Sequence, residues 1–139
     1  MKKLALFAFA ATMLTACNKM DEYLPHFKVK EKGLNLHITV AVGNASTDGT
    51  WECSGTVRWN PTNSSVKHIT ILESDYLYDG TNKSQLIGVE VGSYDVKKSQ
   101  SGFDDFLLYK KPGDHYVYVF DQNDDVVGFY KYTVDPAKP

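Results

Sequence analysis

The sequence predicts an all-β fold, an antiparallel β-sandwich of about seven or eight strands. Apolar and polar residues alternate with a period of two over residues 34–42 and again over residues 51–59, which is the pattern of half-buried strands. Turn-forming Gly, Pro, Asn, Asp and Ser separate the apolar stretches, and from Phe27 onward no apolar stripe has helical spacing. Short strands with frequent turns favour a sandwich over an α/β fold.

The chain opens with the three regions of a secretory leader in order. Lys2 and Lys3 precede an apolar run over residues 4–14, which is too short to cross a bilayer as a stable helix. The ending Leu14-Thr15-Ala16-Cys17 resembles the lipobox of bacterial lipoproteins, in which the cysteine thiol takes a diacylglyceryl group and becomes the first residue of the mature chain. The resemblance implies a signal peptide over residues 1–16 and lipidation of Cys17 with acyl chains such as palmitate.

The resemblance also carries an expectation about localisation. Residues 17–26 are expected to hold the lipidated cysteine and a short polar tether closed by Pro25. The tether from Asn18 to Pro25 has eight residues and spans at most about 28 Å. Asn18 resembles the residue that follows the cysteine in lipoproteins sent to the outer membrane, and we expect that localisation. Asp21 and Glu22 only faintly resemble the acidic surface-export signal of other bacterial groups, so the periplasmic and the surface face of that membrane both stay open.

The length of the mature chain fits one domain, and its net charge limits the classes of partner it could bind. The whole chain has 15 lysines and arginines against 17 aspartates and glutamates, and removal of the leader takes away two lysines and no acid. A mildly acidic domain whose single arginine is Arg58 argues against a nucleic-acid partner. With Cys17 consumed by lipid, Cys53 has no intramolecular partner, and we expect no disulfide.

The β-sandwich domain is expected over residues 27–135, followed by a C-terminal tail over residues 136–139. Both tryptophans of the 51–59 strand fall on its inward face. The further expected strands are residues 66–72 (with Ile69 and Ile71 inward), 86–91, 94–96, 116–120 and 126–134. The last two flank a turn at residues 121–125 and predict a hairpin. Residues 103–109 fit a strand or a single helical turn.

A family resemblance appears at the start of that hairpin. Pro112-Gly113-Asp114-His115-Tyr116-Val117-Tyr118-Val119 resembles the P-G-x-x-Y-x-V-x-V run that opens the penultimate strand of fibronectin type III and related immunoglobulin-like domains. The resemblance implies an immunoglobulin-like sandwich in which Tyr116 would donate the corner hydrogen bond. The chain departs from the pattern at Lys110, where the family has leucine, and at Tyr118, where it has valine. Transthyretin-like sandwiches have similar endings and remain an alternative.

Candidate chemistry is sparse. Cys53 lies on the inward strand face, which predicts a small buried hydrophobe rather than a reactive thiol. The four histidines, His26, His37, His68 and His115, lack ligand spacing, so we expect solvated side chains and no metal site. The acidic turn at residues 121–125 lacks the glycine and the glutamate of a calcium loop. No catalytic motif is present, and the sequence predicts neither an enzyme nor a cofactor.

The aromatic residues give the remaining signal. On residues 116–120 both strand faces are apolar, although a sheet buried on one side needs only one such face. If the tyrosines Tyr116 and Tyr130 point inward, the outward set is Val117, Val119 and Phe129, which would form a contact surface. Tyr76 and Tyr78, in a loop, are further candidate contact residues. The alternative is that a connecting segment, such as residues 103–109, covers the outer face.

These observations predict an outer-membrane lipoprotein with a non-catalytic binding domain. Its expected partner is another envelope or surface protein. One alternative is a carbohydrate-binding module that uses exposed tyrosines. Another is a small inhibitor or exclusion lipoprotein that blocks an incoming enzyme or a phage receptor. The sequence does not choose the partner or the oligomeric state.

Overall fold

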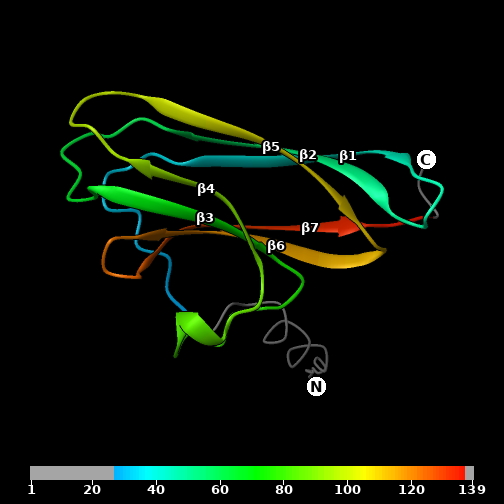
Figure 1. Ribbon diagram of the computed structural model, residues 1–139. Helices are drawn as coiled ribbons and strands as arrows, with labels where there is room; N and C mark the ends of the chain where they lie inside the picture. Colours follow the sequence, from blue (N-terminus) through cyan, green and yellow to red (C-terminus); the bar gives the residue numbers. More distant parts are fainter. Residues whose placement is uncertain (1–26, 137–139) are drawn as a thin grey trace, which may run out of the picture. The chain divides into compact units, whose positions relative to one another are not determined.

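The computed structural model describes residues 27–136, and within them the chain forms seven β-strands and one short 3-10 helix, η1 (Figure 1). The elements are β1 (His37–Ala45), β2 (Trp51–Trp59), β3 (His68–Ser74), η1 (Lys83–Gln85), β4 (Val89–Asp95), β5 (Gly102–Lys110), β6 (Gly113–Asp121) and β7 (Val126–Val134). The expected leader, the tether with Cys17, and His26 lie outside the described residues. Among residues 27–136, none belongs to a helix with the length and apolarity needed to cross a bilayer.

The chain divides into two compact units. The larger one holds residues 28–77 together with residues 82–136 of the described chain, and it contains every strand. The described part of the smaller unit is Phe27 with Tyr78–Thr81. Inside the smaller unit the rings of Phe27 and Tyr78 lie 5.6 Å apart between centroids, and the Asp79 carboxylate accepts hydrogen bonds from the amide and hydroxyl of Thr81.

The strands of the larger unit form two antiparallel sheets, which Figure 1 shows as two layers. The three-stranded sheet has the order β1-β2-β5, and the four-stranded sheet has the order β4-β3-β6-β7. The expectation of an all-β antiparallel sandwich is therefore confirmed. The predicted hairpin is confirmed as β6 and β7, which pair around the turn at residues 121–125.

The core lies between the two sheets and is built mainly from β-branched residues. Val57 of β2 and Ile69 and Ile71 of β3 have no exposed surface, as the alternation predicted for these strands. Trp59 is 5% exposed, and Trp51 is partly buried against the same cluster. Narrow branched side chains suit this position, because two facing sheets are only about 10 Å apart.

In the C-terminal hairpin the predicted faces of β6 are wrong, whereas those of β7, with Tyr130 inward and Phe129 outward, are confirmed. Val117 and Val119 were expected outside, yet both have no exposed surface and belong to the core between the sheets. Val117 pairs directly with Tyr130, so Tyr130 shares their inward face. Tyr116 lies on the opposite, outward face. The two faces could not be told apart by hydrophobicity, because both are apolar.

The outward face of β6 carries a stack of aromatic rings. Tyr116 and Phe129 have ring centroids 6.1 Å apart, and Tyr118 lies 5.5 Å from Phe129 and 6.0 Å from Phe120. Tyr118 and Phe120 are fully buried. A segment of the chain must therefore cover this face.

Two residues of the larger unit that lie between β3 and β4, Tyr76 and Lys83, contact this face. The Tyr118 hydroxyl donates to the backbone carbonyl of Tyr76 over 2.9 Å, and the Lys83 ammonium of η1 lies 5.1 Å from the Phe120 ring centroid. In Figure 1, η1 lies on the side of the four-stranded sheet that faces away from the three-stranded one. A connecting cover was expected, but residues 103–109 do not form it, because they belong to β5 in the other sheet.

Two other boundaries differ from the expectation. The two short strands predicted around residues 92–93 are one strand, β4, with a register shift against β3. Gly92 lies within β4 rather than in a loop, and a Cβ there would lie 2.5 Å from the buried Asp104 carboxylate. The first strand begins at His37 instead of residue 34, and Val42 is 41% exposed.

Candidate functional site

The outer face of the three-stranded sheet is the candidate contact surface. Residues that pair directly across antiparallel strands share a face, so the register identifies the outward rows. These rows are His37–Arg58–Phe103, Thr39–Thr56–Asp105 and Ala41–Ser54–Leu107, followed by Glu52–Tyr109. The intervening residues of β2 are buried in the core, so the outward rows point away from the four-stranded sheet.

Strand β5 places three large apolar side chains on this face, which we call the β5 stripe: Phe103, Leu107 and Tyr109. They are 65%, 51% and 54% exposed, respectively. Their neighbours across the sheet are small or polar, such as Ala41 and Ser54 beside Leu107. The stripe is therefore the apolar part of this face, on a strand that forms one edge of its sheet.

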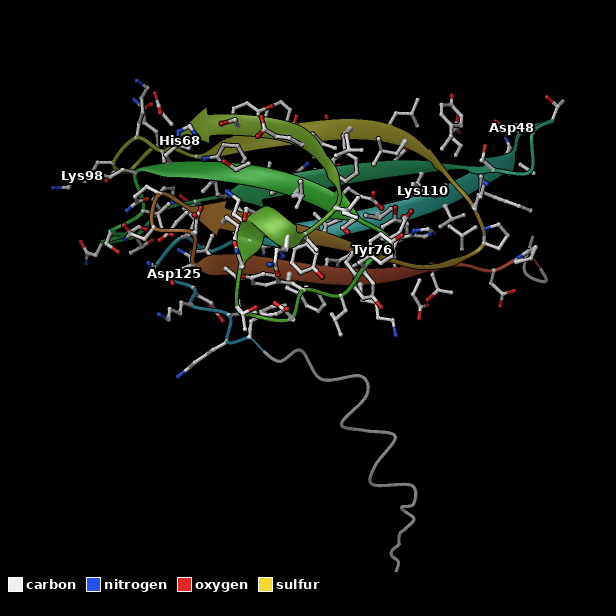
Figure 2. The ribbon with its side chains drawn as sticks, turned by 60° about the horizontal axis from the view of Figure 1, so that its bottom comes forward. Asp48, His68, Tyr76, Lys98, Lys110 and Asp125 are labelled. Carbon is white, nitrogen blue, oxygen red and sulfur yellow. The ribbon has the colours of Figure 1, made fainter. Side chains whose placement is uncertain are left out.

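The sequence-predicted contact residues are not brought together. Val117 and Val119 lie in the core and cannot touch a partner of the folded domain. Phe129 is partly buried in the aromatic stack, and Tyr78 is 8% exposed. Only Tyr76 is well exposed, at 57%, and Figure 2 shows it beside the outer face of the four-stranded sheet.

A buried ionic cluster connects the two sheets at the end of β5 that carries Lys110. The Lys110 ammonium lies 2.9 Å from Oε1 of Glu73 and 2.8 Å from Oδ1 of Asp75. The Glu73 side chain has no exposed surface, and its other oxygen accepts a 2.9 Å hydrogen bond from the Tyr132 hydroxyl. Because Lys110 comes from the three-stranded sheet and Glu73 from the four-stranded one, we call this contact the cross-sheet bridge.

Hydrogen bonds favour the charged forms of Lys110 and Asp75. Burial alone would lower the pKa of Lys110, but its hydrogen bonds to Asp75 and Glu73 outweigh burial and raise it. Burial alone would raise the pKa of Asp75, but hydrogen bonds from Lys110 and His115 lower it. Burial, followed by the nearby Glu73 carboxylate, raises the pKa of Tyr132. Tyr132 is therefore a neutral donor to the Glu73 side chain.

The expectation that His115 is solvated is wrong. His115 is 4% exposed, its Nδ1 lies 2.7 Å from Oδ1 of Asp75, and its Nε2 lies 2.7 Å from the Lys111 carbonyl. His37 is exposed as expected, whereas His68 contacts Asp95 at 2.9 Å. His115 pairs with Tyr132 of β7 across the ladder, so the strand alternation that buries Val117 also buries this ring.

Glu73, Asp75 and His115 bring ligand atoms within 4.8 Å of one another, which is close enough to consider a metal ion. The Lys110 ammonium already contacts both carboxylates of this group. Its raised pKa keeps it charged, so a divalent cation would have to displace a bound positive charge. The geometry therefore fits an ion pair better than a metal centre.

The prediction that Cys53 is buried is confirmed. It is a free, fully buried cysteine, and burial raises the pKa of its thiol.

In the turn at residues 121–125, Lys32 forms ion pairs with Asp121 and Asp125. The Asp121 carboxylate also accepts hydrogen bonds from the amides of Asn123 and Asp125. These carboxylates are thus engaged by the chain itself, as in a plain turn.

Comparisons with known proteins give little beyond this geometry. Neither a scan against protein-family models nor a search of curated proteins finds a match. Among solved structures, the Northeast Structural Genomics Consortium target SoR45 is similar with a TM-score of 0.49 and 5% identity, over 80% of this chain and 93% of that one. The GH3 β-glucosidase of Bifidobacterium adolescentis gives a TM-score of 0.38 and 15% identity over 73% of this chain. The Listeria innocua β-glucosidase in complex with glucose gives 0.35 and 12% over the same share.

The chain spans only 17% and 16% of the two β-glucosidases. At these identities and TM-scores none of the similarities carries an argument about function. The function must therefore be argued from the chain's own residues.

Proposed function

We propose that this chain is an outer-membrane lipoprotein whose immunoglobulin-like domain binds another envelope protein, without catalysis, through the β5 stripe. The observation that carries the proposal is the exposure of Phe103, Leu107 and Tyr109 on one face of one edge strand. Single exposed apolar residues are ordinary on protein surfaces, but here three large ones share one strand face, and Leu107 and Tyr109 are successive outward residues.

The composition of the stripe favours a protein partner. It joins an aliphatic side chain to two aromatic ones, and the polar groups around it include Asp105, between Phe103 and Leu107 on β5, and Thr56 across the sheet. An apolar centre with a polar rim is the usual anatomy of a protein interface. From Phe103 to Tyr109 the strand rises about 20 Å, which fits within a standard interface of about 800 Å² per partner.

The ionisable groups around the cross-sheet bridge support binding rather than catalysis. Lys110, Glu73 and Asp75 neutralise one another, and Tyr132 donates to Glu73. A catalytic group needs to be free to exchange protons with a substrate, whereas these groups are tied to each other. The leader and Cys17 support the anchor, because two or more acyl chains hold a protein firmly on a membrane.

A site-specific cross-linking experiment tests the proposal. A photoreactive phenylalanine analogue replaces Leu107 in the full-length chain in its native cells. The matched control carries the analogue at Val89, which is equally exposed at 52% but lies on β4, an edge of the other sheet. We expect one defined protein adduct at position 107, absent at position 89 and lost when Tyr109→Lys is added. No adduct at 107, or the same adducts at both positions, would refute the β5 stripe as the binding face.

A further inference from the structure

A hollow of about 540 Å³ opens beside the β5 stripe, at the end of the sheet where β1 begins. Its lining includes His37, Arg58, Trp59, Asn60, Phe103 and Asp105. We propose that this hollow binds a neutral pyranose unit of a glycan. The inference goes beyond the protein-binding role, and it shares only Phe103 with the β5 stripe.

Arg58 is the main donor of the hollow. The register places it between His37 of β1 and Phe103 of β5, on the outer face of the sheet. Among residues 27–136 its guanidinium forms no ion pair, whereas Lys32 and Lys110 each contact two carboxylates. Its five N–H donors are therefore available to a ligand.

The other polar groups are held in place by the chain. Asp105 accepts a 2.9 Å hydrogen bond from the Thr56 hydroxyl at Oδ1, which leaves Oδ2 as an acceptor. Asn60 accepts a 3.0 Å hydrogen bond from Ser101 at its side-chain oxygen, which leaves its amide nitrogen as a donor. Asn35 donates to the Asn60 carbonyl over 2.8 Å and fixes that backbone. Donors and an acceptor thus stand ready around one space, so little ordering cost remains for binding.

Two aromatic residues line the hollow, and Phe103, the exposed one, supplies most of its apolar wall. Trp59 is almost buried, and a Cβ on Gly102 would lie 2.4 Å from its ring, so a glycine is required for the ring to lie there. The Trp59 ring also packs against Tyr94, with centroids 5.4 Å apart, which holds it in place. Phe103 is 65% exposed and stands beside it in the lining. An apolar wall with a few fixed polar groups is the usual form of a small-ligand site.

The charges select the class of ligand. An anion would be attracted by Arg58 but repelled by Asp105. A cation would be attracted by Asp105 but repelled by Arg58. A protein side chain could pair with one of the two charges and would leave the other desolvated, which is costly. A sugar satisfies both at once, because neighbouring hydroxyls both donate and accept while the C–H face of the ring packs on an aromatic wall. The volume also falls in the range of about 300–1,000 Å³ that is common for ligand pockets.

Binding can be measured with the full-length lipoprotein in detergent micelles, on a surface carrying neutral and acidic polysaccharides, with neutral methyl glycosides as competitors. We expect retention on at least one neutral polysaccharide and competition by a methyl glycoside. Arg58→Ala and Phe103→Ala should each weaken that binding by about tenfold or more, because each removes a charged donor or an apolar wall. Ser54→Ala, an exposed position on the same face but outside both the hollow and the β5 stripe, is the matched control and should bind as the parent does.

Thermal unfolding of each variant shows that the loss is local, since Arg58 and Phe103 are both exposed. Asp105→Asn is a further variant, which removes the charge of the acceptor and keeps the shape of the side chain. The inference is overturned by absence of retention on every neutral polysaccharide, by binding only to acidic ones, or by full binding of the Arg58 and Phe103 variants. Its failure would leave the cross-link at position 107 untouched, so the two proposals fail separately.

Discussion

Loss of the cross-sheet bridge should destabilise the domain more than any surface change. Lys110→Met keeps most of the side-chain length and removes the charge. It leaves the Glu73 carboxylate, which has no exposed surface, with the Tyr132 hydroxyl as its remaining partner. Breaking a buried ion pair from one side costs about 3–5 kcal/mol, because the other charge stays buried without compensation.

The expected change is large enough to resolve. A domain of this size loses about 4 °C of melting temperature per kcal/mol, so Lys110→Met should melt roughly 12–20 °C lower. The leaderless chain from residue 18 can be unfolded in urea, which does not screen charges as guanidinium does. The urea slope should stay constant if the folded state keeps its compactness.

A second substitution separates the ion pair from simple loss of packing. Glu73→Gln removes the buried charge and keeps an oxygen that can accept the Tyr132 hydrogen bond. Lys110→Met combined with Glu73→Gln should therefore recover more than half of the lost free energy, because the charges are coupled. A loss below about 1 kcal/mol for Lys110→Met alone, or no recovery in the double variant, would refute the reasoning.

The pH dependence of the folding stability provides an independent test of the cross-sheet bridge. The pKa of Asp75 is lowered below its ordinary value of 3.8 by its hydrogen bonds with Lys110 and His115, although burial opposes them. A depressed carboxyl pKa contributes stability above its unfolded value and loses it as the pH falls through the folded one. Stability should therefore decline below about pH 4 in the parent and decline less steeply in Lys110→Met, which lacks the first of those hydrogen bonds. An identical acid slope in both proteins would contradict the assignment.

Two predictions concern the cysteines. Cys17→Ser should abolish incorporation of labelled fatty acid and release the chain from membranes, whereas continued labelling of that variant would contradict the lipid anchor. Cys53 has no exposed surface and a raised thiol pKa, so it should resist alkylation in the folded domain and react promptly in urea, as read by intact mass. Rapid labelling of the native protein would refute its burial.

Local patterns predicted the strands that bury one face. Residues 51–59 alternate cleanly between apolar and polar, and β2 has the expected bounds. Ile69 and Ile71 were assigned correctly for the same reason, because only one face of β3 could be the core. The sandwich followed from these strands and from the turn residues between them. Alternation succeeds where the two faces differ in polarity.

The cross-sheet bridge could not be found in this way. Glu73 and Lys110 lie 37 positions apart, and they meet only because two strands of different sheets face each other. Nothing in the local sequence marks a charged residue as buried when its partner lies in another strand. His115 was misjudged for the same reason, since its contact with Asp75 spans 40 positions.

Two strands, β5 and β6, carry large apolar residues on both faces. The sequence left the outward face of β6 undecided, and it left residues 103–109 between a strand and a helical turn. On β6 the outward rings are covered by the chain itself, with Tyr118 bonded to Tyr76 and Lys83 over Phe120. On β5 the outward residues Leu107 and Tyr109 stay about half exposed. A strand with two apolar faces therefore carries more apolar surface than the core can bury. The second face is then covered by a segment of the same chain or by a partner. Because the outward face of β5 stays exposed, we expect the partner to bind the three-stranded sheet.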